Sequence, residues 1–271
     1  LKSTKIFLVK NLLTNNSVSD IVMLYKIIHR KNKAKALTGN GNLPLLFFII
    51  LKIWEDTAMK LKDTGLTFKD IKDKVNKYMI ETYERFDFLA ETADGMYIYD
   101  ENGTPYLDFY AGIAVNSAGN CNPKVVAAAK DQLDDIMHTF NYPYTIPQAL
   151  LAEKVCETIG MDKIFYQNSG TEANEAMIKM ARKYGIEKYG PNRYHIVTAK
   201  MGFHGRTFGA MSATGQPGNG CQVGFGPMTY GFSYAPYNDL QAFKDACTEN
   251  TIAIMVEPVQ GEGGVHPATM E

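Results

Sequence analysis

Between residues 163 and 256, short apolar runs alternate with stretches of helical pattern. Three of these runs are rich in strand-favouring residues: KIFYQN (163–168), RYHIVTA (193–199) and TIAIMV (251–256). Between them we expect one helix from about Thr171 to Tyr189 and another near 239–248. Strands joined through helices pair in parallel, and a parallel sheet needs helices on its faces. The alternation therefore predicts an α/β fold with a mostly parallel sheet covered by helices.

A smaller α+β segment is expected before this pattern. Residues 67–85 carry apolar side chains at helical spacing: Phe68, Ile71, Val75, Tyr78 and Met79. Residues 95–109 alternate apolar and polar side chains around Asn102-Gly103, which is a strong hairpin signal. Farther along, Pro123 opens a helical stretch, and a second stretch ends at Gly160, a residue type that commonly ends helices.

Residues 1–58 differ in composition from the rest of the chain. They carry nine lysines and arginines against three acidic residues, whereas residues 59–271 carry 19 basic and 26 acidic side chains. The apolar run Leu43–Trp54 has about half the length that a membrane-crossing helix needs, and Lys52 interrupts it. We expect the biological protein to start at Met59 and residues 1–58 to be translated upstream DNA. The alternative is a genuine amino-terminal extension that touches a membrane.

Composition narrows the classes of function. The formal net charge of −1 favours neither a nucleic-acid nor a membrane partner. None of the four cysteines forms a C-x-x-C pair, so no metal site is expected, and free thiols indicate a reducing cytoplasm. The expected division is residues 1–58 with no domain, 59–110 as the helix and hairpin of a small domain, and 111–271 as the first part of a large domain.

The first motif with chemical content is NSGTEANE, residues 168–175, where a strand is expected to turn into a helix. Ser169 and Glu172 have the spacing of a capping box, so the helix begins here. The free N–H groups of its first turn, together with the helix dipole, form an anion site. The alternative is a well-capped helix that binds nothing.

The second motif is GFHGRT, residues 202–207, directly after the RYHIVTA run. A phenylalanine can cover a flat ring, and an arginine can bind a carboxylate through two parallel hydrogen bonds. Phe203 and Arg206, placed among glycines, therefore suit the mouth of a pocket. The alternative is a solvated loop with one buried aromatic side chain.

The third motif is EPVQGEGG, residues 257–264, where an expected buried strand ends in an acidic, glycine-rich loop. In open α/β sheets, ligands bind at the carboxyl ends of strands. The alternative is a flexible turn whose acidic side chains face water.

Together these motifs resemble the class III aminotransferases of the type I pyridoxal-phosphate-dependent transferase fold. NSGTEANEA, GFHGRTFGAMSATG and VEPVQGEGGV resemble that family's signatures and follow one another in the family's order. The stretch YLDFYAGIAVNSAG (106–119) further resembles acetylornithine aminotransferases. The resemblance covers the chain from Met59 to Glu271.

The resemblance implies pyridoxal 5'-phosphate as cofactor and assigns residues to it. The backbone of Gly170 and Thr171 would hold the phosphate. Phe203, with His204 beside it, would stack on the pyridine ring, and Glu257 would lie near the ring.

The resemblance also implies residues that bind substrate and the partners of the protein. Arg206 would bind a substrate carboxylate, and Glu262 resembles the family's gating acid. The implied partners are a small amino acid, a 2-oxo acid and, in the complete protein, a second copy in a homodimer.

The implied function is transfer of an amino group from N-acetylornithine, or a similar ω-amino donor, to 2-oxoglutarate in arginine biosynthesis. Ornithine, succinylornithine and 4-aminobutyrate are alternative donors, and an aminomutase reaction is a further alternative. The family also carries an aspartate and a Schiff-base lysine in motifs that do not occur up to Glu271. We therefore expect this truncated chain to be inactive alone. The alternative to an aminotransferase is that the chain is a non-catalytic fragment.

Overall fold

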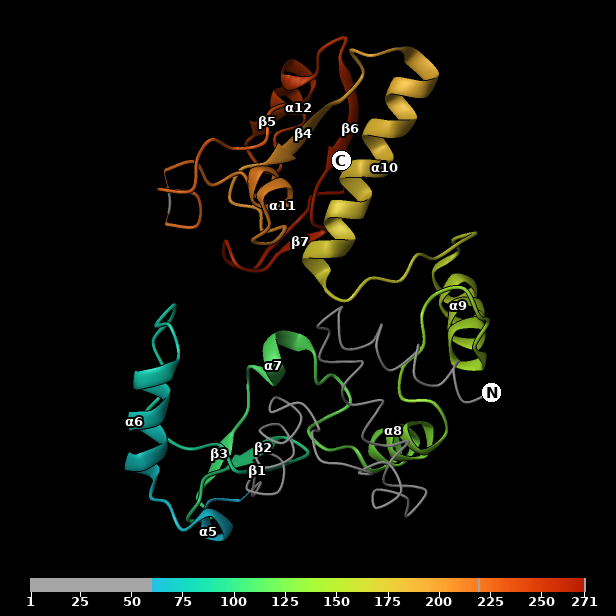
Figure 1. The fold of residues 1–271 in the computed structure, drawn as a ribbon. Helices are drawn as coiled ribbons and strands as arrows, with labels where there is room; N and C mark the ends of the chain where they lie inside the picture. Colours follow the sequence, from blue (N-terminus) through green and yellow to red (C-terminus); the bar gives the residue numbers. More distant parts are fainter. Residues whose placement is uncertain (1–59, 219, 271) are drawn as a thin grey trace, which may run out of the picture. The chain divides into compact units, whose positions relative to one another are not determined.

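The computed structural model describes residues 60–218 and 220–270, so the expectations for residues 1–58 lie outside the described part of the chain. The chain divides into two compact units, Leu1–Phe140 and Asn141–Glu271, which are taken one at a time below (Figure 1). The expected boundary between a small and a large domain, between residues 110 and 111, stays a prediction. No helix in the described ranges combines the length and the apolar character that crossing a bilayer requires.

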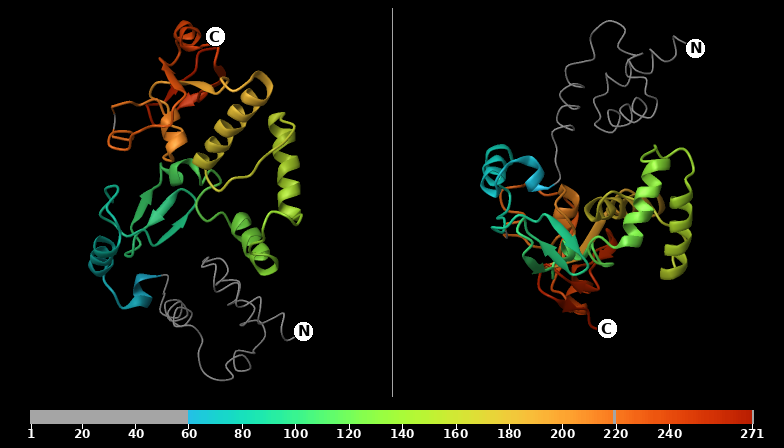
Figure 2. Two further views of the ribbon diagram at one scale, coloured as in Figure 1. Left: turned by 45° about the horizontal axis from the view of Figure 1, so that its top comes forward. Right: turned by 90° about the horizontal axis from the view of Figure 1, so that it is seen from below.

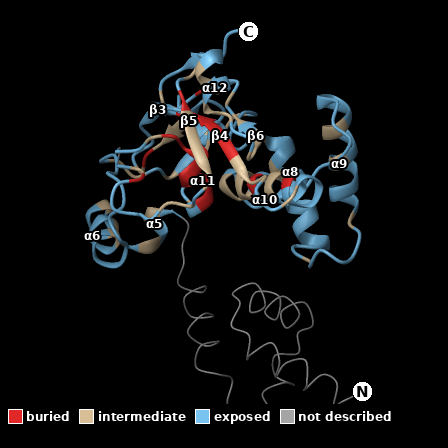
Figure 3. Cartoon of the chain, turned by 90° about the horizontal axis from the view of Figure 1, so that it is seen from above, coloured by how far each residue is buried: buried red, intermediate tan, exposed pale blue. Residues whose placement is uncertain are grey.

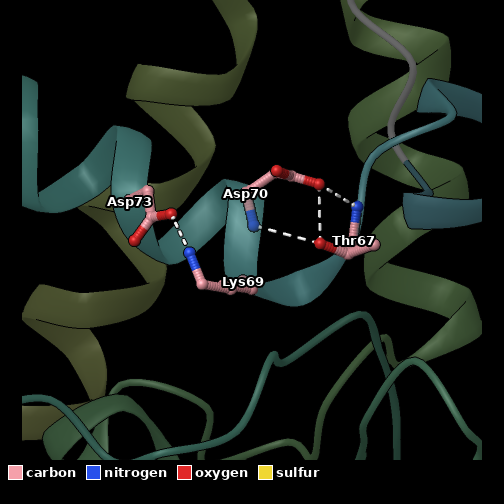
Figure 4. Close-up of polar contacts among 4 residues, drawn as sticks. All are labelled: Thr67, Lys69, Asp70 and Asp73. Carbon is pink, nitrogen blue, oxygen red and sulfur yellow. Dashed lines mark hydrogen bonds and ion pairs between the residues drawn. The ribbon is translucent and has the colours of Figure 1, made fainter.

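The main helix of the first unit, α6 (Phe68–Tyr78), begins with a capping box. Thr67 Oγ1 accepts the N–H of Asp70 at 3.2 Å, and the Asp70 carboxylate accepts the N–H of Thr67 at 2.8 Å (Figure 4). Lys69 pairs with Asp73, one turn farther along, at 2.6 Å. Local sequence thus determines where α6 starts, because each partner lies within four residues.

The short helix α5 (Leu61–Thr64) precedes α6. The expected apolar stripe is confirmed only in its first part, since Phe68, Ile71 and Val75 are half-buried, whereas Tyr78 and Met79 are exposed. The helix ends at Tyr78 rather than near residue 85, because the backbone of Met79 is extended.

The hairpin predicted around Asn102-Gly103 is confirmed. It joins β2 (Tyr97–Tyr99) to β3 (Pro105–Leu107), and β1 (Thr92–Asp94) pairs with the other edge of β2, so that three antiparallel strands form a sheet (green arrows in Figure 2). Asp100 Oδ1 accepts the N–H of Thr104 at 2.8 Å, which closes the turn.

Two further helices complete the described part of the first unit. The four residues of α7 (Ala111–Ala114) include left-handed backbone at Gly112 and at Ile113. The predicted helix after Asn122 is α8 (Pro123–Asp135), and the Asn122 side chain accepts the N–H of Lys124 at 3.0 Å.

The second unit starts with α9 (Ile146–Ile159), which ends at Gly160 in the left-handed conformation, as predicted. The longest helix, α10 (Gly170–Tyr189), lies beside the sheet (Figure 1). Gly185 allows this close approach, because a Cβ there would overlap the carbonyl oxygen of Arg193.

The sheet of the second unit is parallel. Its strands β4 (His195–Ala199), β5 (Phe232–Ala235) and β6 (Thr251–Met255) have the order β5-β4-β6. The central strand β4 is the most buried, while α9 is largely exposed (Figure 3). The packed core consists of Ile178, Ile196 and Ala213 with Ala181, Phe232, Ile252, Ala253 and Met255. The predicted α/β fold with a parallel sheet is confirmed.

Two short helices and a two-stranded ladder complete this unit. The helices are α11 (Phe208–Ala213), directly after the GFHGRT motif, and α12 (Leu240–Ala246), next to β5. The ladder pairs β7 (Val259–Gln260) with β8 (His266–Pro267).

One predicted strand is wrong and one observed strand was not predicted. Residues 163–168 form no strand. An extended segment needs a hydrogen-bonded neighbour to become part of a sheet, and none of the described strands pairs with it. Conversely, Phe232–Ala235 forms β5 although its four residues carry only a weak strand signal.

Candidate functional site

The three motifs meet where the carboxyl ends of β4 and β6 face the amino-terminal turn of α10. Thr171 Oγ1 of the first motif lies 3.2 Å from Thr207 Oγ1 of the second. Glu257 Oε2 of the third motif accepts the N–H of Phe203 at 3.0 Å. Segments that are far apart in sequence are therefore joined by direct hydrogen bonds, as the location rule for α/β sheets anticipates.

The amino terminus of α10 presents unpaired backbone donors. Ser169 Oγ accepts the N–H of Glu172 at 3.3 Å, so half of the predicted capping box is formed. In the part of the chain that the structure describes, no acceptor takes the N–H groups of Gly170 and Thr171. Gly170 is exposed, and open space surrounds the position of a Cβ there. This turn can therefore bind an anion.

Phe203 and Arg206 lie against each other. The guanidinium carbon of Arg206 is 5.4 Å from the centroid of the Phe203 ring, a cation–π geometry. Arg206 is exposed and Phe203 is half-buried. The structure thus brings together the flat apolar ring and the two-pronged cation that the sequence pattern predicted for a pocket mouth.

His204 points inward and is 5 % exposed. The backbone N–H of His204 donates to Thr214 Oγ1 at 3.1 Å, and its backbone carbonyl accepts from Asn174 Nδ2 at 2.7 Å. Burial lowers the pKa of the imidazole, although the nearby Glu257 carboxylate opposes this. Nε2 is buried and has no hydrogen-bond partner among the described residues. A stacking role for His204 stays a prediction.

Gly205 is a site residue that sequence reasoning passed over. Its φ of 128° lies in the region that favours glycine. A Cβ at this position would overlap Oγ1 of Thr171, so only glycine lets the motif lie directly on the first turn of α10. The glycine that follows the histidine in GFHGRT was the available signal.

Asn174, Glu175 and Thr207 are three further residues that were missed. Glu175 Oε1 accepts hydrogen bonds from Thr207 Oγ1 at 2.5 Å and from the N–H groups of Gly209 and Ala210 at 3.0 and 3.1 Å. The sequence places Glu175 four residues after Thr171, on the same helix face, but it does not reveal what that face contacts.

The loop after β6 is held from both sides. Tyr237 donates its hydroxyl hydrogen to the carbonyl of Glu257 at 2.8 Å, and Gln260, which is 2 % exposed, donates to the carbonyl of Lys200 at 2.9 Å. Glu262 is exposed. A hollow of about 370 Å³ lies beside the loop and is lined by Lys200, Met201, Pro236, Tyr237, Asn238, Gln260, Gly263 and His266.

Metal-ligating side chains do not gather here. Within residues 60–218 and 220–270, no three His, Cys, Asp or Glu side chains are grouped so that they could hold a metal ion. The polar groups that do converge are backbone N–H groups, two threonine hydroxyls, one guanidinium, one imidazole and the carboxylates of Glu175 and Glu257.

Known proteins are similar to this chain over most of its length. An acetylornithine aminotransferase of Caldanaerobacter subterraneus is 48% identical over 195 residues, which cover 72% of this chain and 49% of that protein. An acetylornithine aminotransferase of Methanocaldococcus jannaschii is 48% identical over 196 residues, again 72% and 49%. The chain thus spans about half the length of the curated relatives that it matches.

Solved structures agree with the sequence matches. A crystal structure of ornithine aminotransferase from Toxoplasma gondii, with pyridoxal phosphate in partial occupancy at its active site, superposes with a TM-score of 0.71 at 30% identity. The match covers 81% of this chain and 50% of that structure. Residues 78–271 also match the sequence profile of the family described as Aminotransferase class-III. The chain belongs to the class III aminotransferases and has the α/β fold of the pyridoxal-phosphate-dependent members.

Proposed function

We propose that this chain contributes the phosphate site and the carboxylate-binding arginine of an aminotransferase that uses pyridoxal 5'-phosphate. The observation that carries the proposal is the contact between the first turn of α10 and the Phe203–Thr207 segment, made through Thr171 and Thr207. Through this contact, a helix terminus whose free N–H groups suit an anion lies next to an aromatic ring and an arginine.

The described residues fit a phosphorylated cofactor with a flat ring. The N–H groups of Gly170 and Thr171 have no acceptor among the described residues and suit a phosphate. Phe203 offers a ring for stacking, and the buried Nε2 of His204 needs a polar partner. When bound, the cofactor supplies an electron sink for the transfer of an amino group.

The remaining residues would orient the substrate. Arg206 would bind a substrate carboxylate through two parallel hydrogen bonds. Glu257 would lie near the cofactor ring, where its carboxylate already holds the backbone of Phe203. Glu262 would act as the gating acid, and its exposure leaves its carboxylate open to a basic partner.

N-acetylornithine and 2-oxoglutarate are the proposed substrates, in arginine biosynthesis, within a cytoplasmic homodimer. The support is the name of two relatives that are each 48% identical to this chain. Ornithine, the substrate named for the similar Toxoplasma gondii structure, is the closest competitor as amino donor.

The gene product that contains this chain should be supplied with pyridoxal phosphate, 2-oxoglutarate and each amino donor in turn. We expect glutamate to form fastest with N-acetylornithine. A preference for ornithine, succinylornithine or 4-aminobutyrate would reassign the substrate, and no 2-oxo acid consumption with any donor would overturn the aminotransferase proposal.

The phosphate site can be tested without turnover. Calorimetric titration of this chain with pyridoxal phosphate and with pyridoxal should show tighter binding of the phosphorylated ligand. Thr171→Pro removes one N–H donor and should reduce that difference, whereas Lys183→Ala, on the exposed side of α10, should leave it unchanged. Equal affinities for both ligands would show that the first turn of α10 does not bind the cofactor phosphate.

A further inference from the structure

We infer that Glu175 is a positioning residue that determines where the Arg206 guanidinium lies. It acts through the backbone of the segment that joins β4 to α11. The inference rests on the proposed function only in assigning a substrate carboxylate to Arg206.

Glu175 caps α11 from another helix. Its Oε1 accepts the N–H groups of Gly209 and Ala210, the second and third residues of α11, at 3.0 and 3.1 Å. These amides have no acceptor within their own helix. Thr207, at the N-cap position, makes no capping hydrogen bond to α11 and instead donates its hydroxyl hydrogen to Glu175. A carboxylate at this end also interacts favourably with the helix dipole.

The neighbours of Glu175 on α10 hold the same segment. Thr171 lies four positions before Glu175 and three before Asn174, so its side chain neighbours both of theirs on the surface of α10. Thr171 Oγ1 lies 3.2 Å from Thr207 Oγ1, and Asn174 Nδ2 donates to the carbonyl of His204 at 2.7 Å. The anchored residues, His204 and Thr207, flank Arg206 on both sides.

Arg206 depends on this backbone for its position. Among the described residues no carboxylate lies within ion-pair distance of it, and its side chain rests on the ring of Phe203. The anchors leave little freedom, because a Cβ on Gly209 would lie 2.5 Å from Glu175 Oε2. Loss of the Glu175 carboxylate therefore releases Thr207 and the start of α11 together.

The test follows the side-chain Nε–Hε signal of Arg206 by NMR in the full 271-residue chain. The chain has five arginines, so Arg206→Lys assigns the signal by its disappearance. In Glu175→Ala we expect the ring-current shift from Phe203 to be lost and the amides of 208–213 to exchange at least about tenfold faster. Glu175→Gln keeps an acceptor oxygen but loses the charge, so it should show a smaller change in the same direction in both readouts.

Glu187→Gln is the matched control, because it removes the same charge from the same helix at an exposed position whose partner is Lys183 at 3.5 Å. An unchanged Arg206 signal in Glu175→Ala would overturn the inference. Faster exchange spread equally over β4, β5 and β6 would also overturn it, since Glu175 would then act only on general stability. If Glu175→Ala does not fold, the intermediate Glu175→Gln decides by the same two readouts.

Substrate binding separates this inference from the proposed function. In the gene product that contains the chain, Glu175→Ala should raise KM for the 2-oxo acid about tenfold or more, and Glu175→Gln should raise it less, while the affinity for pyridoxal phosphate stays within about twofold in both variants. If the parent binds no 2-oxo acid but its Arg206 signal responds to Glu175, the proposed function fails and the positioning role stands. If KM is unchanged and the Arg206 signal does not move, the positioning role fails.

Discussion

The antiparallel sheet of the first unit and the parallel sheet of the second are built from contacts of different range. Strands β1 to β3 all lie within 92–107, and a single side chain, Asp100, closes the turn between two of them. In the parallel sheet, Ile196 pairs with Phe232 on one side and with Ala253 on the other. Turn chemistry is enough to form the first sheet, whereas the second forms only when distant segments pack.

The two sheets also differ in burial and in function. No residue of β1 to β3 is buried, while four of the five residues of β4 are. The candidate site belongs to the unit with long-range contacts. A site built from three distant motifs needs a packed scaffold, since 1 Å errors in position are costly to catalysis.

The largest expected effect compares one isoleucine in each sheet. Ile196→Ala removes a side chain that is 1 % exposed from the core cluster and should lower the free energy of unfolding of the second unit by about 3 kcal/mol or more. Ile98→Ala, in half-buried β2, should cost the first unit about 1 kcal/mol. Urea unfolding with segment-resolved hydrogen exchange measures both. Equal losses would contradict the contrast between the sheets.

The second effect compares two arginines that each lie over an aromatic ring. In the gene product that contains the chain, Arg206→Lys should lower kcat/KM for both substrates by about ten- to a hundredfold, since a charged hydrogen bond contributes about 1.5–3 kcal/mol and lysine lacks the planar fork. Arg85 is the matched control, because its guanidinium carbon lies 5.1 Å from the centroid of the Tyr83 ring. Arg85→Lys should leave the kinetics unchanged. Unchanged kinetics in Arg206→Lys would show that Arg206 does not bind a substrate carboxylate.

A smaller effect is expected at the cap of α6. Thr67→Ala removes the acceptor for the Asp70 N–H and should destabilise the helix by about 1 kcal/mol. The loss should appear as faster amide exchange in 68–78 with no change in β4 to β6. Thr82→Ala, at an exposed position outside the helix, serves as control. Propagation of the effect into the parallel sheet would show that the cap is not a local feature.

The smallest expected effect is a difference in how the stability of the two sheets depends on pH. Burial lowers the pKa of His195, and the charge of Arg182 adds to this. The fold thus favours neutral imidazole, so this contribution to stability is complete above the ordinary value of about 6.5 and is lost as pH falls below it. His195 bonds Thr251 and Ser233 across both strand pairs, at 2.7 and 2.8 Å.

Asp100 responds in a lower pH window. Burial alone would raise the pKa of its carboxyl, but the hydrogen bonds from Thr104 and Asn102 outweigh burial and lower it. Its contribution is complete above the ordinary value of about 3.9 and is lost as pH falls through the lowered one. Between pH 7 and 5, β4 to β6 should lose protection from exchange before β1 to β3, after correction for intrinsic rates. His195→Gln should weaken the loss of protection in β4 to β6. That result would distinguish the contribution of His195 from the contribution of buried His204.

Sequence signals predicted the elements whose causes are local. The Asn102-Gly103 hairpin, the left-handed Gly160 and the start of α10 next to Ser169 were all foreseeable, because turn and cap residues act within a few positions. The roles of Gly170, Thr171, Phe203, Arg206 and Glu257 follow from the resemblance of the motifs to the family's signatures, and they stay predictions.

Tertiary structure decided what depends on neighbours distant in sequence. Residues 163–168 have a strand-like composition but no paired strand among the described residues, whereas β5 forms because β4 lies beside it. The first amides of the short helix α11 donate to Glu175, which lies more than thirty residues earlier.

The sequence alone therefore determined the family, the α/β class and the chemistry that the motifs can provide. Only the folded chain decided that Gly205 must lie on Thr171, that His204 turns inward and that Glu175 holds the segment before α11. The physical reason is that residue type sets what a group can bond, while packing between distant segments sets which partner it reaches.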